Sequence, residues 1–261
     1  MTDPAWRIVR GTGSPLVATA IHDGHAVRPE VAALLALDDA ARLREEDPFT
    51  SRWVGAASTQ IVGLRSRFEF DLNRPRQQAV YVTPEDAWGL EIWRSRPDEE
   101  LIARSLEIYD AFYREVHELL SELVERFGKV VVLDLHSYNY RRSGPNSAPA
   151  DPAANPEVNL GTASLDREIW GPIVETALSA LREFDFVGRR LDVRENVKFQ
   201  GGQFVRWMHQ EFPTTVCGLA IEFKKTFMDE WTGQGDSEHV DAIGRAVGCL
   251  ADRIGEGLGT L

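Results

Sequence analysis

Three stretches of nearly unbroken apolar residues predict buried strands along the chain. They are residues 14–21 (SPLVATAI), 129–137 (KVVVLDLHS) and 214–223 (TTVCGLAIEF). The first two begin at turn residues, a Gly-Ser-Pro sequence and a glycine respectively. Because a strand covered on both faces reads as a continuous apolar run, these stretches predict the interior of a sheet.

Apolar residues at helical spacing fill the segments between these strands. Residues 28–44 predict one or two short helices, which Pro48 prevents from continuing. A longer helical pattern runs through residues 98–127 and meets a stop signal at Gly128. A further helix is predicted over residues 165–184. The order of helices and strands predicts an α/β fold with helices on both faces of a mostly parallel or mixed sheet.

Two other segments are distinguished by their polar residues. In residues 60–74, apolar and charged residues alternate through FEFDL, which predicts a strand whose end presents Asn73 and Arg74. Residues 142–159 are rich in Pro, Ala, Ser, Gly and Asn, which predicts a long surface loop that can serve as a lid. This loop is too short and too close to the neighbouring motifs to be a domain linker.

The length and composition limit the architecture. The chain has 261 residues, of which 43% are hydrophobic and 27% are charged, so it can bury a substantial core without a second domain. We therefore expect residues 1–261 to form a single three-layer α/β/α domain. The sequence leaves the oligomeric state open.

The charge and the cysteine content exclude several classes of partner. A net charge of −12 and a pI of about 5.0 argue against nucleic acid and anionic membranes, because both are polyanions. An anionic small molecule would need a local basic pocket. Cys217 and Cys249 are too few for a disulfide framework or a four-thiolate zinc site. No apolar run reaches the ~18 residues of a membrane span, and no signal-like segment is visible at the N-terminus, so we expect a soluble, cytoplasmic protein.

Polar residues stand at the ends of the predicted strands. They are His22, Asn73 with Arg74, His136 and Glu222. Ligands of open α/β sheets bind at the carboxyl ends of the strands, so we expect these distant residues to converge on one site. A lone strand-end histidine is more often a hydrogen-bonded structural residue than a metal ligand, but the presence of two weakens that interpretation.

Two imidazoles and one carboxylate, with an open position for water, form a common catalytic zinc site. The segment REEDPFT offers Asp47 and Glu46 as the carboxylate, although side chains in such a charge run more often face solvent. Zinc lowers the pKa of a bound water to about 7, and Glu222 is a natural base to accept its proton during attack on a carbonyl. The residues by themselves therefore indicate a candidate zinc hydrolase.

Seven short motifs, taken in order, resemble those of the N-formylglutamate amidohydrolase family between about His22 and Trp231. They are IHDG, EDPFT, SRFEFDLNRP, VVLDLHSY, NLGT, KFQGGQF and LAIEF. That family is related in fold to the zinc carboxypeptidases, and HSY and NR here look like the metal-ligand and carboxylate-binding segments of those enzymes. The resemblance implies a hydrolase of the phosphorylase/hydrolase-like α/β/α class.

The resemblance also implies a set of metal ligands. His22 and His136 would bind Zn²⁺, and Asp47 aligns best with the aspartate that supplies the third ligand, with Glu46 as the alternative. Asp134 precedes His136 by two residues, so on an extended strand it points to the same side and is placed to orient that imidazole.

The substrate contacts implied by the resemblance lie around this metal. Arg74, helped by Asn73, would bind the substrate α-carboxylate, since an arginine fork binds a carboxylate with two hydrogen bonds. Glu222 would be the general base, and Arg67 is expected to stabilise the oxyanion alongside zinc. The pocket for the substrate side chain is expected to be lined by Lys198, Gln200, Gly201 and Gly202.

These features predict a zinc-dependent amidohydrolase that cleaves an N-acyl group from a small anionic amino acid. N-formyl-L-glutamate, giving formate and L-glutamate, is the leading substrate. A carboxypeptidase-like enzyme acting on a short peptide or another N-acyl amino acid is the alternative with the same site. A noncatalytic protein that binds zinc or an acidic ligand is the alternative from another class, and Glu222 argues against it because binding needs no general base.

Overall fold

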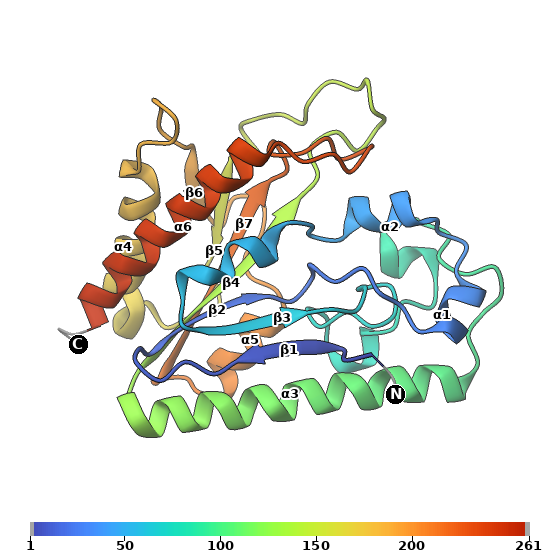
Figure 1. The fold of residues 1–261 in the computed structure, drawn as a ribbon, viewed down its shortest axis with the longest axis horizontal. Coiled ribbons are helices and arrows are strands. Elements are labelled where there is room, and N and C mark those ends of the chain that lie inside the picture. Colours follow the sequence, from blue (N-terminus) through green and yellow to red (C-terminus); the bar gives the residue numbers. More distant parts are fainter. Residues whose placement is uncertain (1–2, 259–261) are drawn as a thin grey trace.

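The computed structural model describes residues 3–258, which form a seven-stranded mixed sheet with helices on both faces (Figure 1). In spatial order the strands are β1 (Trp6–Val9), β3 (Thr59–Gly63), β2 (Leu16–Ala20), β4 (Val130–Tyr138), β7 (Val216–Lys224), β5 (Val158–Gly161) and β6 (Val193–Glu195). The neighbours β3, β2, β4 and β7 are parallel, whereas β1 and β5 run antiparallel to β3 and β7. The predicted α/β fold with a mixed sheet is therefore confirmed.

The predicted helices are present between the strands. The α-helices of the described residues are α1 (Pro29–Leu34), α2 (Asp39–Glu45), α3 (Glu99–Phe127), α4 (Arg167–Glu183), α5 (Gln203–Glu211) and α6 (Ser237–Leu258). Short 3₁₀ helices are η1 (Thr50–Arg52), η2 (Val54–Ala56), η3 (Arg76–Gln78) and η4 (Pro84–Ala87). None of the helices within residues 3–258 is long and apolar enough to cross a membrane.

The central strands separate two helical layers. On β4, Val131, Leu133 and Leu135 belong to the core cluster that contains α4 and α6 residues. Val130 and Val132 belong to the cluster that contains α3 and α5 residues. This alternation follows from the pleat of a strand, and Figure 1 shows α3 along one side of the sheet and α4 with α6 along the other. Side chains of β4 that share the face of Val132 therefore lie on the α3 and α5 side, and they include His136.

The long helix α3 has clear signals at both ends. The side chain of Asp98 accepts a hydrogen bond from the backbone N–H of Leu101 at 2.8 Å, which caps the first turn. The helix ends before Gly128, whose φ of +79° is a left-handed conformation that favours glycine. These residues explain why the sequence predicts the limits of this helix closely.

The predicted strand over residues 60–74 is wrong beyond Gly63. β3 ends there, and the following residues form turns in which the N–H of Glu69 donates to the Ser66 carbonyl and the N–H of Arg74 donates to the Asp71 carbonyl. The apolar side chains that alternate in the sequence are buried against different neighbours, Phe68 against the α1 region and Phe70 against α3. Buried carboxylates hold this irregular segment through hydrogen bonds to its backbone and side chains.

Candidate active site

A cavity of about 420 Å³ lies where β2, β4 and β7 end. The basic side chains that line it among the described residues, apart from histidines, are Arg67, Arg74, Arg142, Arg206 and Lys225. The acidic ones are Glu45, Asp47 and Glu222. The cavity is thus locally basic in a chain of net charge −12, as an anionic ligand requires.

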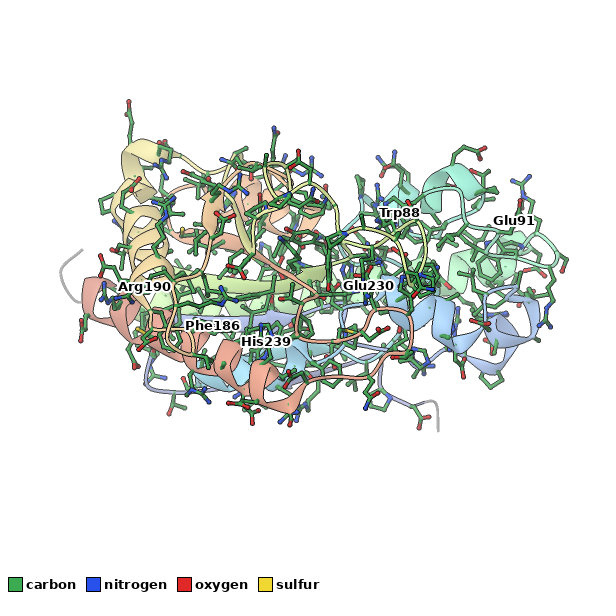
Figure 2. The ribbon with its side chains drawn as sticks, turned by 90° about the horizontal axis from the view of Figure 1, so that it is seen from above. Trp88, Glu91, Phe186, Arg190, Glu230 and His239 are labelled. Carbon is green, nitrogen blue, oxygen red and sulfur yellow. The ribbon has the colours of Figure 1, made fainter. Side chains whose placement is uncertain are left out.

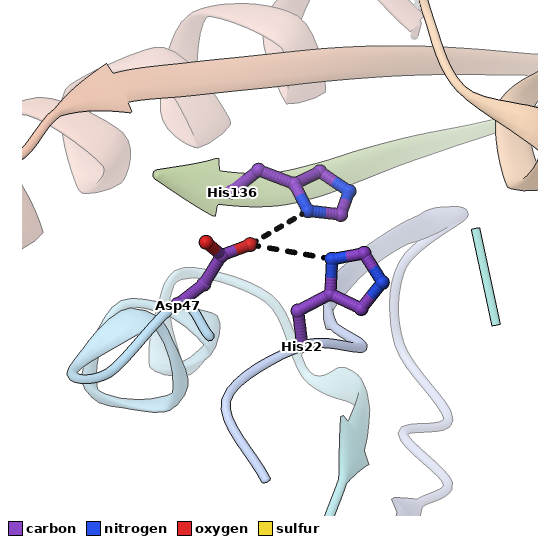
Figure 3. A group of neighbouring side chains, drawn as sticks. All are labelled: His22, Asp47 and His136. Atoms are coloured by element: carbon purple, nitrogen blue, oxygen red, sulfur yellow. Dashed lines mark hydrogen bonds and ion pairs between the residues drawn. The ribbon is translucent and has the colours of Figure 1, made fainter. Parts of the chain in front are cut away.

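His22, Asp47 and His136 form a buried group that faces this cavity (Figure 3). Their potential ligand atoms all lie within 4.8 Å of one another. Asp47 Oδ2 lies 3.0 Å from His136 Nδ1 and 3.4 Å from His22 Nδ1. The first histidine follows β2, the second lies near the end of β4, and the aspartate follows α2. The sheet therefore unites residues that are far apart in the sequence.

The outer nitrogen of each imidazole is held by a carboxylate. His22 Nε2 lies 2.8 Å from Asp71 Oδ1, and His136 Nε2 lies 2.8 Å from Asp134 Oδ2. Because these oxygens accept hydrogen bonds, each Nε2–H donates and each Nδ1 is left as the electron-pair donor that a metal needs. The donor set of two imidazoles and a carboxylate, with both rings fixed in this way, fits Zn²⁺.

The pKa values of Asp47 and His136 are shifted by the charged groups that lie next to them. Burial acts to raise the pKa of Asp47, but hydrogen bonds from His136 and His22 hold that pKa below its ordinary value. Burial acts to lower the pKa of His136, but the Asp134 carboxylate and then Asp47 hold it well above its ordinary value. Without a cation, the protein therefore favours an imidazolium beside a carboxylate. A divalent cation competes with the proton for the same atoms.

The structure groups Asp47, and not Glu46, with the two histidines. The Glu46 carboxylate accepts a hydrogen bond from Ser66 Oγ and lies 2.5 Å from His25 Nδ1 and 3.7 Å from Arg42 Nη1. The Asp47 Oδ1 atom instead accepts from Ser137 Oγ at 3.2 Å, beside His136. Glu46 is therefore fully engaged on the other side of the segment, and the alternative third ligand is not supported.

Asp71 is a residue of the site that sequence analysis missed. Besides His22, its carboxylate accepts hydrogen bonds from Arg67 Nη2 at 2.6 Å, from the Asn73 backbone N–H at 2.7 Å and from the Tyr81 hydroxyl. It is completely buried, which acts to raise its pKa, but the Arg67 charge together with His22 and the Tyr81 hydrogen bond holds that pKa well below the ordinary range. From the alternation in FEFDL we expected Asp71 to lie on a strand. The structure instead places Asp71 in a turn, where its carboxylate contacts His22 Nε2.

Arg67 lines the cavity, but its guanidinium is already engaged. Nε and Nη2 donate to Asp71, and Nη1 donates to the Glu45 backbone carbonyl at 3.2 Å. Trp88, labelled in Figure 2, lies against the same guanidinium, with 4.9 Å between its ring centroid and Arg67 Cζ. The geometry therefore supports a positioning role for Arg67, and its predicted contact with the oxyanion stays a prediction.

Glu222 faces the cavity from β7, directly opposite His136 of β4 in the parallel register. Its carboxylate hydrogen-bonds to none of the side chains within residues 3–258. Burial raises the pKa of Glu222 to about 7, with Asp47 adding to the rise and His136 opposing it. A carboxyl group with this pKa both accepts and releases protons near neutral pH.

Arg74 and Asn73 also line the cavity. The Arg74 guanidinium forms no hydrogen bond or ion pair with residues 3–258 and lies 5.9 Å from the Tyr81 ring centroid. Asn73 Oδ1 accepts a hydrogen bond from the Phe204 backbone N–H at 2.9 Å, which leaves Nδ2 as a donor. A Cβ atom on Gly202 would lie 2.2 Å from that Oδ1, so a glycine is needed there for the Asn73 side chain to fit.

Of the residues predicted to form the side-chain pocket, one lies in the lining of the cavity. Gly202 lines the cavity, whereas Lys198, Gln200 and Gly201 are not among the described residues that line it. Lys198 Nζ donates to Asn155 Oδ1 at 2.5 Å, and Gln200 is exposed. In the KFQGG segment, Phe199 lines the cavity, and the chain turns at Gly201, whose φ is +104°.

Other cavity residues were not signalled by the sequence. Asn139 is buried at the end of β4, and its Oδ1 has no hydrogen-bond partner within residues 3–258. Trp88 adopts a left-handed φ of +55° after η4, and the guanidinium carbons of Arg74 and Arg142 lie 6.0 and 5.6 Å from its ring centroid. Lys225 is buried one residue beyond β7. Each residue type is ordinary in its sequence context, so only the fold reveals its position.

Comparisons with known proteins indicate the family and the fold of the chain. A family model described as N-formylglutamate amidohydrolase matches residues 14–228. The chain is similar to the crystal structure of N-formylglutamate amidohydrolase from Ralstonia eutropha JMP134, with 18% identity, a TM-score of 0.76 and coverage of 98% of each chain. It is also similar to a gene product from Agrobacterium tumefaciens, with 17% identity, a TM-score of 0.67 and coverage of 98% of this chain and 95% of that chain. A search of curated proteins found no match.

Proposed function

Because the chain belongs to the N-formylglutamate amidohydrolase family, we propose that it is a zinc-dependent enzyme that hydrolyses N-formyl-L-glutamate to formate and L-glutamate. The observation that carries this proposal is the buried group of His22, Asp47 and His136 next to Glu222, in one basic cavity. The Glu222 carboxylate has no hydrogen-bond partner among residues 3–258. A hydrolase acting on an amide bond uses such a combination of a metal site and a base.

We propose that His22, Asp47 and His136 hold Zn²⁺ through Nδ1, a carboxylate oxygen and Nδ1. When bound there, zinc supplies a Lewis acid that polarises a carbonyl oxygen and makes water more acidic. Asp71 and Asp134 fix the two imidazoles in the tautomer that this arrangement requires. The protein's part is to keep these donors in place before the substrate arrives.

The substrate would be oriented by the basic side of the cavity. Arg74, with no protein partner within residues 3–258, is placed to bind the α-carboxylate, and Asn73 Nδ2 adds a second donor. Because the cavity is locally basic, a carboxylate bound there gains an electrostatic stabilisation that it lacks in bulk water. Arg142 and Arg206 add positive charge to the same cavity.

Glu222 would handle the protons of the reaction. Its carboxylate accepts a proton from the attacking water, and the resulting carboxylic acid can donate that proton to the amide nitrogen as the C–N bond breaks. In the metal-free protein the pKa of Glu222 is about 7, so this carboxyl group can both accept and release a proton near neutral pH, as the two steps require. We propose that residues 1–261 act as a single catalytic domain, and that it works in the cytoplasm.

The test is formate release by purified protein of known zinc content. N-formyl-L-glutamate is assayed beside N-acetyl-L-glutamate, N-formyl derivatives of neutral amino acids and a panel of dipeptides. Formate release that requires zinc and favours the acidic substrate supports the proposal. Release of the C-terminal residue from dipeptides instead would support the carboxypeptidase-like alternative, and tight binding without turnover would support a noncatalytic role.

A further inference from the structure

Lys225 is a buried cation that forms no ion pair with a carboxylate in the part of the chain that the structure describes. Its side chain is 1% exposed, although it lines the cavity. No Asp or Glu oxygen among residues 3–258 lies within 4.0 Å of its ammonium. Nζ instead donates to two backbone carbonyls, those of Arg44 and Glu46, at 2.6 Å each. A buried ammonium is costly to desolvate, so such a residue needs a compensating interaction.

The two carbonyls belong to the segment that presents Asp47. Helix α2 ends at Glu45, and the last carbonyls of a helix have no partner within the helix. Lys225 satisfies those of Arg44 and Glu46, while Arg67 Nη1 satisfies the one between them at 3.2 Å. Three successive carbonyls directly before Asp47 therefore accept hydrogen bonds from the cations of Lys225 and Arg67, which also suit the negative end of the helix dipole.

This arrangement joins Asp47 to the strand that carries Glu222. Lys225 follows β7, and its backbone N–H donates to the Tyr138 carbonyl of β4 at 3.0 Å. The Asp47 backbone N–H in turn donates to the His22 carbonyl at 2.9 Å. The ammonium thus adds a second main-chain link between the central strands and Asp47, the one of the three predicted metal ligands that does not lie at a strand end.

We propose that Lys225 is a positioning residue that fixes the α2 C-terminus so that the Asp47 carboxylate faces His22 and His136. The inference rests on the metal site of the proposed function. It assigns Lys225 no contact with the substrate: the ammonium acts through two main-chain carbonyls, and the affinity for the metal is the property that depends on it. A lysine is suited to this task because its three donors can reach carbonyls in different directions.

The test compares Lys225→Met with Lys224→Met in zinc affinity, measured by competition with a chromophoric chelator. The methionine keeps a similar apolar stem but cannot donate, so the expected result is at least a tenfold weaker zinc affinity, comparable to other losses of support around a metal. Lys224 is the matched control, because its ammonium hydrogen-bonds to no residue within 3–258. Its replacement should leave the affinity unchanged within about twofold, a margin well inside the effect expected at Lys225.

Two further variants separate positioning from a general loss of stability. Leu250→Ala removes a buried side chain of the core that contains α4 and α6, so it should lower the melting temperature without changing zinc affinity. Lys225→Arg keeps a cation and several donors, so it should retain more zinc affinity than Lys225→Met, and it provides the comparison if the methionine variant does not fold.

The outcomes distinguish this inference from the proposed function. If the wild-type protein binds zinc but hydrolyses no N-acyl amino acid, the function is wrong and the Lys225 comparison still decides the inference. Wild-type zinc affinity in Lys225→Met, or an equal loss in Leu250→Ala, overturns the positioning role. A wild-type protein that binds no divalent cation overturns both.

Discussion

His136 of β4 and Glu222 of β7 are direct partners in the parallel register of the two central strands. Both side chains face the same cavity, so the fold places an imidazole and a carboxylate side by side where neighbouring strands end. Burial is the main reason that the pKa of Glu222 rises to about 7, and the His136 charge limits that rise. The register of this strand pair therefore positions both the histidine that we propose as a metal ligand and the carboxylate that we propose to move protons.

Replacing Glu222 with Gln should lower kcat by at least about 10²-fold, the usual effect of removing a general base. The variant keeps the shape of the side chain and leaves His22, Asp47 and His136 intact, so zinc stoichiometry should stay at the wild-type value. Steady-state kinetics on zinc-loaded protein, with metal content measured on the same sample, check both statements. A variant that loses zinc but keeps its turnover per bound zinc would make Glu222 a ligand.

The same substitution should change how the stability of the metal-free protein depends on pH. The pKa of Glu222 is about 7 in the folded protein, against 4.5 for a free carboxyl, so the folded state binds the proton more tightly. Its contribution to stability is complete below pH 4.5 and is lost as the pH rises through 7, a change equivalent to about 3 kcal/mol.

Glu222→Gln cannot ionise and should therefore avoid this loss. Relative to wild type, the chelator-treated variant should gain more in free energy of unfolding at pH 8 than at pH 5. Urea unfolding of both proteins at the two pH values measures this difference. An equal difference at both values would show that the Glu222 carboxyl titrates outside this range.

The sequence predicted those elements whose residue pattern depends only on local backbone geometry and burial. The continuous apolar runs of β4 and β7 and the helical stripe of α3 are properties of local geometry and burial, so they were visible without the fold. The residues placed just after apolar strands, such as His22, could be assigned to one edge of the sheet because strand ends of an α/β sheet share that edge.

The missed features depend on contacts between distant segments. In FEFDL, buried carboxylates replace the ladder hydrogen bonds of a strand, and alternation alone does not distinguish the two. Lys225 follows another lysine, so the sequence predicts a solvent-exposed charge. In the structure it is buried, and its ammonium donates to a carbonyl at the C-terminal end of α2. The spacing of apolar residues in a segment predicts its local structure, but it does not identify the distant segment that it contacts in the folded protein.

Asp71→Asn should weaken zinc affinity by about 10–100-fold, the range seen when the partner of a metal-binding histidine is lost. The amide has a single acceptor oxygen, so it cannot hold His22 Nε2–H and Arg67 together as the carboxylate does. Chelator competition measures the effect. Asp110→Asn, which removes an exposed ion pair with Arg76, is the control and should leave the affinity unchanged. Wild-type affinity in the Asp71 variant would mean that the His22 ring needs no support from this carboxylate.

Arg74→Met should impair substrates with a free α-carboxylate selectively. The guanidinium lines the cavity without a protein partner within residues 3–258, so its charge is available to a ligand. Methionine keeps an apolar stem and removes the charged fork, which should cost about 2–5 kcal/mol in kcat/KM if the carboxylate pair is desolvated.

The matched substrate for this prediction is the α-amide of the same N-formyl amino acid, which occupies similar volume but carries no α-charge. The loss in kcat/KM should be much smaller for the amide than for the free acid, and zinc content should not change. Arg206→Met is the matched control, because Arg206 also lines the cavity but its Nε donates to the Gly202 carbonyl at 3.2 Å. In the Arg206→Met variant, the losses in kcat/KM for the free acid and for the amide should differ less than in the Arg74→Met variant. Equal losses for both substrates in the Arg74 variant would show that Arg74 acts on the shape or general charge of the cavity and does not bind the α-carboxylate.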